Sequence, residues 1–271
     1  MNEENKSLSP IEVYLYLCDL QDKESKKMNL FNIFKKKENI ISKETYYNNL
    51  INIKEINQYG YESSYANQEP ILYKIYGNAR ILNNNISILV ISDTHNTLNE
   101  KEFKNFILTN NNYDICLLLG DFGYLDIPII LKYVSKDKIY AILGNHDTNY
   151  INEYGLNDLN GKIITIKGIK ILGIMGSFRY KPSKFPSFSQ KESIEFLNSK
   201  EEADILVSHD TGFNNLSSND PAHQGLFGIT YYLYKNRVPY HIHGHIHNPY
   251  QKNLLNGTKE ISAYQYQIFH L

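Results

Sequence analysis

Five short, mostly apolar runs of this chain are each followed by residues that can bind metal ions. The runs span residues 88–91, 115–119, 139–143, 205–207 and 240–242. Short runs rich in isoleucine, leucine and valine predict buried strands. In an open α/β sheet, the side chains that follow the strand ends gather beyond one edge, so segments far apart in sequence meet there. We therefore expect an α/β domain with a polar site at the edge of its sheets.

The residues that follow these runs carry carboxylate, amide and imidazole groups. The segments are Asp93-Thr94-His95, Gly120-Asp121, Gly144-Asn145-His146-Asp147, Ser208-His209 and Gly244-His245-Ile246-His247. In an extended segment, residues two apart point to the same side, so His245 and His247 can both reach one site. An isolated His-x-His pair is more often structural. The hypothesis of a metal site therefore depends on the other four segments.

In this order, the five segments resemble the signature of the calcineurin-like metallophosphoesterase superfamily, which runs D-x-H, G-D, G-N-H-D/E, an isolated His and G-H-x-H. The resemblance covers residues 86–270 and points to the small bacterial type of phosphoesterase. It implies a four-layer α/β/β/α sandwich, in which two sheets face each other and helices cover the outside. We divide the chain into a mainly helical N-terminal extension, residues 1–82, and a catalytic domain, residues 83–271.

The resemblance also implies a site for two divalent metal ions. Asp93, His95 and His247 would hold one ion, Asn145, His209 and His245 the other, and Asp121 would bridge them. Two cations about 3.5–4 Å apart need a shared anion, and they lower the pKa of bound water from about 15.7 to about 7. A hydroxide that bridges the metals would then attack the phosphorus atom. This mixture of ligands suits manganese, iron, nickel or zinc and does not choose among them.

His146 has a catalytic role in the resembled family, where it stabilises the transition state and protonates the leaving oxygen. Asp147 beside it can orient the ring and raise its basicity. Alternatively, Asp147 caps a helix or a turn. His241 and His243 continue the alternation toward His245, but the ligand set is complete without them. We expect these two histidines to orient other groups or to pack.

The chain departs from common forms of the signature at two points. Asn96 follows His95 where many relatives carry glycine, and asparagine also tolerates a left-handed backbone. Asp210 and Thr211 follow His209 where proline-rich continuations are frequent. The second change is expected to reshape the wall of the pocket.

Two further residues are candidates for binding substrate. Arg179 lies among aromatic residues in segment 176–188, and arginine binds phosphate while aromatic rings stack on bases, which favours a nucleotide. Alternatively, this segment is a surface loop whose aromatic side chains cap the core. His223 lies in a segment that resembles part of small bacterial family members near the pocket. It would bind substrate, support a ligand or cap a helix.

We therefore expect a metal-dependent phosphoesterase that acts on a small phosphodiester or nucleotide. One alternative is a phosphatase of phosphoproteins or small phosphomonoesters. Another is a non-catalytic binding scaffold with the same fold, which the complete ligand set disfavours. A nuclease acting on DNA ends would need a broad basic surface, and the formal net charge of -1 gives no such field. Nucleic acid is thus not the expected partner.

Residues 1–82 follow a different pattern from the rest. Ser9-Pro10 predicts the start of one helix, and a second helix is predicted from about Ser42. Residues 71–82, interrupted by Gly77-Asn78, predict a hairpin or an edge strand. The basic and aromatic segment 31–37 is predicted to be a solvated helix or linker, with contact to a membrane surface or a nucleic acid as the less favoured alternative. This extension packs on the sandwich, covers the site or pairs two subunits in a homodimer, and the sequence leaves these alternatives open.

The catalytic region has its own predicted elements. Helices are expected over residues 100–108, 127–133 and 190–197, a hairpin over 162–174 around Gly168, and further strands within 250–268 around Asn256-Gly257. Two cysteines, Cys18 and Cys116, do not make a disulfide framework, and Cys116 is predicted to be a buried thiol. The sequence shows no signal-like start and no apolar run near about 18 residues. We expect a cytoplasmic protein with no membrane partner.

Overall fold

The computed structural model describes residues 69–179, 182–213 and 221–271. The helices predicted near Ser9 and Ser42, the segment 31–37 and Cys18 lie outside them.

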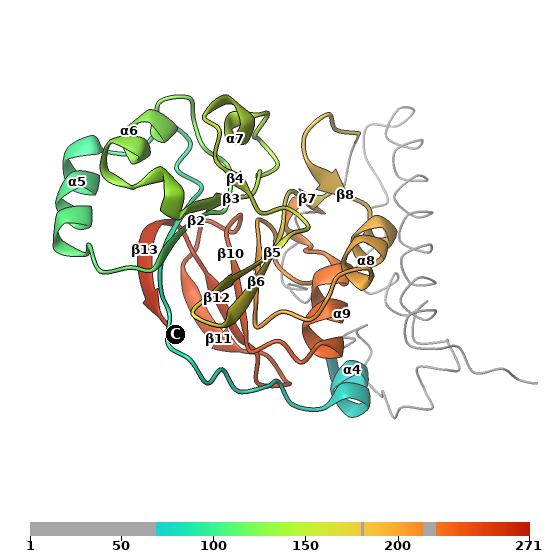
Figure 1. The fold of residues 1–271 in the computed structure, drawn as a ribbon. Coiled ribbons are helices and arrows are strands. Elements are labelled where there is room, and N and C mark those ends of the chain that lie inside the picture. Colours follow the sequence, from blue (N-terminus) through green and yellow to red (C-terminus); the bar gives the residue numbers. More distant parts are fainter. Residues whose placement is uncertain (1–68, 180–181, 214–220) are drawn as a thin grey trace, which may run out of the picture.

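Two sheets face each other in the middle of the molecule (Figure 1). In spatial order, the first contains β13 (Gln265–His270), β1 (Ser87–Ser92), β2 (Ile115–Leu118), β3 (Ile139–Ala141) and β4 (Asn157–Asp158). The second contains β11 (Tyr250–Asn253), β12 (Lys259–Ser262), β10 (Tyr240–His243), β9 (Ile205–Ser208), β6 (Ile169–Ile174) and β5 (Ile163–Ile166). The inner strands of both sheets run parallel, and β13, β5 and β11 are antiparallel at the edges. A third, two-stranded sheet is formed by β7 (Ser177–Phe178) and β8 (Ser187–Phe188), which run parallel.

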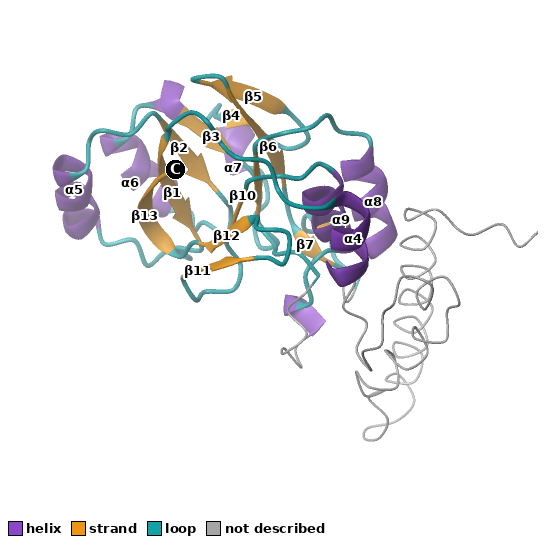
Figure 2. Ribbon diagram, turned by 90° about the horizontal axis from the view of Figure 1, so that it is seen from below, coloured by secondary structure: helices purple, strands orange, loops and turns teal. Residues whose placement is uncertain are grey.

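Helices cover the outer face of each sheet (Figures 1 and 2). The first sheet is covered by α5 (Glu100–Thr109), α6 (Asp126–Tyr133) and the short α7 (Tyr150–Glu153). The second is covered by α8 (Gln190–Asn198) and α9 (Phe227–Lys235), with α4 (Glu69–Tyr76) packed against α9. Two 3-10 turns, η1 (Lys136–Lys138) and η2 (Pro221–His223), complete the described elements. The predicted α/β/β/α sandwich is confirmed.

The layers follow from strands that are apolar on both faces. In β1, Ile88 and Val90 pack between the sheets, whereas Leu89 and Ile91 pack beneath the helices of the first sheet. Successive side chains of a strand point to opposite faces, so an uninterrupted apolar run buries both. The same alternation recurs in β2, β6 and β9. Each sheet therefore contributes to two apolar layers.

Most predicted elements of the catalytic region are confirmed. Helices α5, α6 and α8 lie where helices were predicted, and α8 begins with a capping box formed by Ser189 and Glu192. Strands β5 and β6 form the predicted hairpin, with Lys167 and Gly168 at φ 50° and 79°. Strands β11 and β12 form a second hairpin, and β13 then crosses to pair with β1.

The prediction of a hairpin or edge strand over residues 71–82 is wrong. The chain forms α4 instead, which ends at Tyr76 and is followed by Gly77 with φ +75°. Leu72, Ile75 and Tyr76 recur at helical spacing and pack against the cluster around α9. Farther on, the Arg80 guanidinium pairs with Asp204 at 2.9 Å. The division of the chain at residue 82 stays a prediction.

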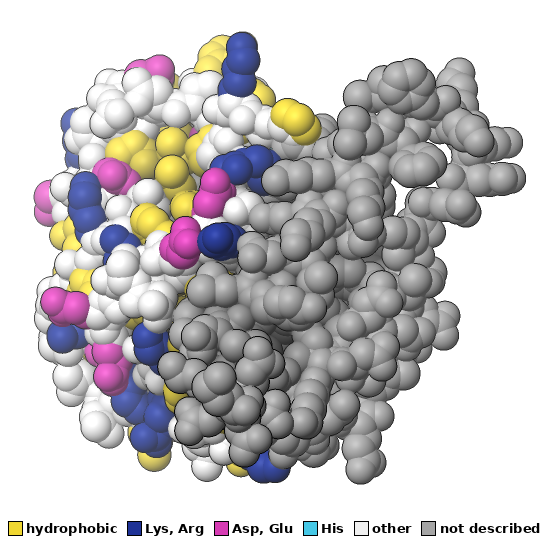
Figure 3. All heavy atoms as spheres, turned by 90° about the vertical axis from the view of Figure 1, so that its right-hand side faces the viewer, with side chains coloured by type: hydrophobic (Ala, Val, Ile, Leu, Met, Phe, Trp, Pro, Cys, Tyr) yellow, Lys and Arg dark blue, Asp and Glu magenta, His cyan; other side chains and the backbone are white. Residues whose placement is uncertain are grey.

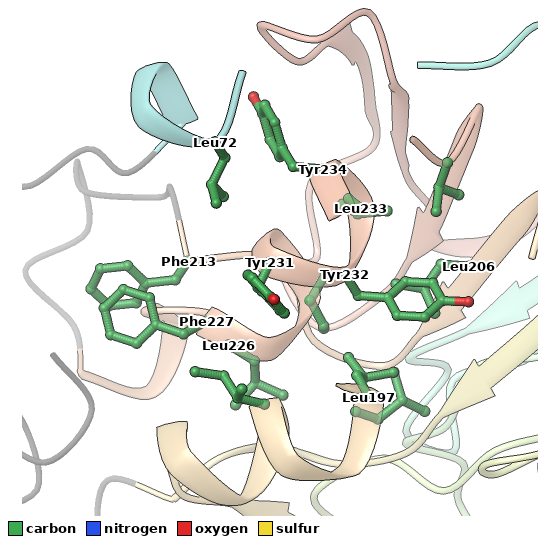
Figure 4. Packing of buried hydrophobic residues seen from close by; sticks show 14 of the residues in the cluster. Leu72, Leu197, Leu206, Phe213, Leu226, Phe227, Tyr231, Tyr232, Leu233 and Tyr234 are labelled. Atoms are coloured by element: carbon green, nitrogen blue, oxygen red, sulfur yellow. The ribbon is translucent and has the colours of Figure 1, made fainter. Parts of the chain in front are cut away.

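Leu72→Ala is expected to lower the free energy of unfolding by about 2–5 kcal/mol, the range for truncating a buried leucine. Leu72 is 0% exposed and points from α4 toward Tyr231 and Tyr234 of α9 (Figure 4). Urea unfolding measures the change. Ile81→Ala is the control, because Ile81 is 84% exposed and its truncation should change stability by less than about 0.5 kcal/mol. Equal effects of the two variants would contradict the packing of α4 on this core.

The predicted state of Cys116 is confirmed. Its thiol is free and buried within β2, on the side that faces the helices of the first sheet. Burial disfavours the charged thiolate, which raises the pKa of Cys116 well above its ordinary value. This cysteine is therefore a small apolar core residue and not a reactive thiol.

Candidate metal centre

The five ligand segments meet where the carboxyl ends of β1, β2 and β3 face those of β9 and β10. The structure brings the acidic and histidine candidates into two groups, Asp93, His95 and His247 in one and Asp121, His209 and His245 in the other. Within each group the potential ligand atoms lie within 4.8 Å of one another. Asn145 joins the second group, because its Oδ1 lies 2.9 Å from His209 Nε2. These groups have the composition that the resemblance implied.

In the first group, three potential ligand atoms face one another. His95 Nε2 lies 3.3 Å from His247 Nε2, which lies 3.2 Å from Asp93 Oδ1. Asp93 is 1% exposed, and its Oδ1 accepts no hydrogen bond from a described residue. A buried carboxylate oxygen without a hydrogen bond is costly, and a cation between it and the two imidazoles would satisfy all three atoms.

In the second group, backbone carbonyls determine which imidazole nitrogen carries the proton. His209 Nδ1 lies 2.8 Å from the Leu119 carbonyl oxygen, and His245 Nε2 lies 2.9 Å from the Ala222 carbonyl oxygen. A carbonyl only accepts, so these nitrogens donate, and the opposite nitrogen of each ring is the one that a metal ion would bind. A metal-binding histidine commonly donates its other N–H to a carbonyl in this way.

The buried charges of the second group favour a cation. Burial opposes ionisation of Asp121, but the His209 charge and hydrogen bonds, including one from the His146 amide at 2.8 Å, lower its pKa well below the ordinary range. Burial likewise opposes a charged His209, but Asp121 and Asp93 raise the pKa of His209 to about 10. The carboxylates therefore create a field in which positive charge is stable, and this fits a divalent ion.

Several candidate ligands have an unusual backbone conformation. Among the described residues, nine that are not glycine have positive φ, and five of these nine are candidate ligands. The five are Asp93, His95, Asp121, His245 and His247, with φ between 43° and 66°. Such conformations cost on the order of 1–3 kcal/mol each and cluster at functional sites. Asn96 has φ 64°, the left-handed backbone that asparagine was expected to tolerate.

Two glycines leave space for the ligand carboxylates. A Cβ atom added at Gly144 would lie 2.1 Å from Asp121 Oδ1, and one added at Gly244 would lie 2.4 Å from Asp93 Oδ2. Both distances are far below van der Waals contact. The glycines of the G-N-H-D and G-H-x-H segments are therefore required by the close approach of backbone to carboxylate.

His146 lies beside the two groups without joining either. Its exposed ring lies 5.8 Å from the His95 ring, and its Nε2 lies 4.0 Å from Asp121 Oδ2. The Asp147 carboxylate contacts the backbone and not this ring: it accepts hydrogen bonds from the amides of Gly144, Asp121 and Phe122 at 2.7, 2.7 and 3.0 Å. These contacts favour the alternative in which Asp147 caps a turn over the one in which it orients His146.

The two candidate substrate residues differ in their positions. The Arg179 guanidinium pairs with Glu192 of α8 at 2.9 Å and donates to the Ser187 carbonyl oxygen at 2.8 Å. Phe178 and Phe188 of the same segment pack on the core, so the described contacts favour the surface-loop alternative for Arg179. The ring of His223 lies 4.7 Å from the ring of His245, beside the second group.

The structure also places residues near the site that the sequence analysis did not single out. Asp126 is 1% exposed and accepts hydrogen bonds from the loop that follows β1. The Tyr264 ring lies 5.4 Å from the His247 ring. Asp210, noted only as a departure, is buried and accepts from the Phe178 amide at 2.9 Å. The one sequence signal for Asp126 was its position directly before the predicted helix 127–133.

His241 and His243 are buried on β10 and absent from both groups. Their rings stack at 5.1 Å, and His241 Nδ1 lies 3.5 Å from Glu260 Oε2. These contacts agree with the expectation that the two histidines orient other groups or pack.

Comparisons with known proteins find solved structures to which the chain is similar. One solved crystal structure is 11% identical with a TM-score of 0.53, and the match covers 69% of this chain and 95% of that one. TT1561 of Thermus thermophilus is 12% identical with a TM-score of 0.47, over 67% of this chain and 90% of its own. Phosphopantetheinyl hydrolase of Mycobacterium tuberculosis is 14% identical with a TM-score of 0.46, over 66% and 89%. No curated protein sequence matches the chain.

A comparison with protein families is more specific. The family model for calcineurin-like phosphoesterases matches residues 86–249, a range that contains all five ligand segments. This range is more than half of the 271 residues. The chain therefore belongs to the calcineurin-like phosphoesterase family and is a metallophosphoesterase, a hydrolase of phosphate esters.

Proposed function

We propose that the chain hydrolyses a small phosphate ester, preferably a phosphodiester or a nucleotide, with two divalent metal ions. One observation carries this proposal: seven donor side chains from five strand ends gather in two adjacent groups. Asp93, His95 and His247 would hold one ion, and Asn145, His209 and His245 the other. Asp121 would lie between them, because its Oδ2 is 3.9 Å from His95 Nε2 and 3.5 Å from His209 Nε2.

The donor set fits a phosphate substrate. When bound, the two ions would provide a water-derived nucleophile near neutral pH and would offset charge on the phosphate. Asp93 and Asp121 are the only carboxylates in the two described groups, so two dications would leave the pocket positively charged. An anion would therefore be attracted locally, although the formal net charge of the chain is -1.

The protein's own groups would handle the leaving oxygen and the substrate. His146 is exposed beside both groups and would donate a proton to the leaving oxygen. Asp147 would keep the turn of His146 in place through its three backbone hydrogen bonds. His223, beside His245, would contact the substrate. The His, Asp and Asn donors suit manganese, iron, nickel or zinc.

One face of the described part of the molecule carries mixed charge. On the described part of the face in Figure 3, Lys and Arg side chains are interspersed with Asp and Glu side chains. A strong electrostatic site for nucleic acid would instead need a continuous basic surface. Within the described ranges, no helix is both long and apolar enough to cross a lipid bilayer. A cytoplasmic location and a homodimer stay predictions.

Aryl phosphate monoesters and diesters, assayed with manganese, nickel or zinc, test the proposed function. We expect turnover that depends on added metal, stops with a chelator and is faster for the diester. Faster turnover of the monoester would favour the phosphatase alternative. Folded protein that binds metal but hydrolyses neither ester class would contradict the proposal and favour the scaffold alternative.

A further inference from the structure

Asp126 is a buried carboxylate whose partners lie outside its own helix. It is the first residue of α6 and is 1% exposed. Its Oδ2 accepts hydrogen bonds from Thr94 Oγ1 at 2.6 Å and from the amides of Asn96 and Gly123 at 2.8 Å each. Its Oδ1 accepts a longer bond from the Leu98 amide at 3.4 Å. In the described part of the chain, no basic side chain pairs with it.

These contacts differ from those of a helix cap. A side chain that caps a helix accepts from the first amides of that helix, and α6 has no such side-chain bond at its N-cap, Leu125. Three of the four donors to Asp126 belong instead to the loop that follows β1. Because a buried carboxylate is stable only when well hydrogen-bonded, this loop and Asp126 fix each other's positions.

The loop held by Asp126 contains two of the five left-handed ligand positions and their neighbour Asn96. Asp93, His95 and Asn96 have φ of 56°, 43° and 64°. The bonds from Thr94 and Asn96 lie on either side of His95 in the chain. The remaining donor, Gly123, is two residues beyond Asp121. One carboxylate thus connects the loop of the first ligand group to the loop of the bridging candidate.

We propose that Asp126 is a positioning residue of the metal centre, which sets the distance between the Asp93–His95 loop and Asp121. The inference rests on the proposed function. Asp126 would mainly affect the binding of the ion held by Asp93, His95 and His247. The second group has another support, since the amides of Gly144 and Asp121 bond to Asp147.

Asp126→Asn tests this role, with Asp114→Asn as a matched control. Asp114 directly precedes β2 and accepts a hydrogen bond from the amide of Ser87, the first residue of β1, at 2.8 Å. It also pairs with Lys167 at 2.7 Å. Asp114 therefore lies at the ends of β1 and β2 that are opposite to the metal centre. Calorimetric titration with Mn²⁺ measures both affinities, and electron paramagnetic resonance detects the coupled Mn²⁺ pair. We expect Asp126→Asn to weaken one of the two sites about 10–100-fold and to reduce the pair signal. Asp114→Asn should leave both affinities unchanged.

Thr94 provides a second test with a smaller change. Thr94→Val removes the hydroxyl that bonds to Asp126 with little change in shape, and Thr94→Ser keeps it. We expect Thr94→Val to weaken the same site, and Thr94→Ser to retain wild-type affinity. If Asp126→Asn and Thr94→Val lower thermal stability but leave both Mn²⁺ affinities intact, Asp126 is only structural and the inference is wrong. Absence of turnover with a normal Mn²⁺ pair would instead contradict the proposed function alone.

Discussion

Asp121→Asn is expected to lower kcat/KM by about three orders of magnitude and to weaken the binding of both metal ions. The Asp121 carboxylate belongs to the second ligand group and also approaches the first, because its Oδ2 lies 3.5 Å from His209 Nε2 and 3.9 Å from His95 Nε2. The amide has the same shape but no charge to offset the repulsion between two dications. Charge stabilisation by such ions is worth several kcal/mol, and about 1.4 kcal/mol corresponds to a tenfold change in rate. Steady-state kinetics and elemental analysis measure the two effects.

A surface carboxylate provides the control for Asp121→Asn. Asp158 pairs with Lys162 at 3.3 Å near the molecular surface, so Asp158→Asn should keep both metals and nearly all activity. The asparagine at position 121 can still accept the bond from the His146 amide, and circular dichroism would verify that the fold is retained. Full occupancy of both metals in Asp121→Asn would exclude a bridging carboxylate at this position.

His146→Asn should keep both metals while kcat falls by about 10²–10⁴-fold, the range for losing a general acid. The ring is exposed beside His95 and belongs to neither ligand group. Because it would protonate the leaving oxygen, the loss should be largest for esters with poor leaving groups, such as alkyl esters. Nitrophenyl esters, whose leaving group needs little protonation, should be affected less. Comparing kcat for the two ester types measures this difference.

A distant histidine is the control for His146→Asn. His270 lies at the end of β13, where its Nδ1 is 3.0 Å from Ser87 Oγ, and His270→Asn should change neither metal content nor kcat. Loss of a metal ion from His146→Asn would make His146 a ligand. An equal decrease in kcat for the two ester types would show that His146 is not the general acid.

The ligand segments could be predicted because each is a local pattern. A short apolar run determines a buried strand, and the residue types directly after it are visible without knowledge of the fold. The arrangement of parallel strand ends then brings the segments together. Composition, in contrast, could not show that each ligand of the first group has a left-handed backbone. Only Asn96 offered such a signal, because asparagine tolerates that conformation.

Contacts between distant segments could not be predicted. The Asp147 carboxylate bonds to the Asp121 amide, and the Arg179 guanidinium pairs with Glu192; both partners depend on where a loop folds back. Leu72, Ile75 and Tyr76 have helical spacing, but the sequence did not show that α9 is the surface on which they pack. Similarly, β13 lies in the first sheet because its register with β1 buries Phe269 between the sheets.

Each ligand group draws on both sheets of the sandwich. Asp93 and His95 follow a strand of the first sheet, whereas His247 follows a strand of the second, and the other group is divided in the same way. An ion held in either group would therefore link the two sheets through its ligands. At a free concentration one hundred times its Kd, each such ion would add about 2.7 kcal/mol against unfolding. Catalysis and the cohesion of the two halves would then depend on the same atoms.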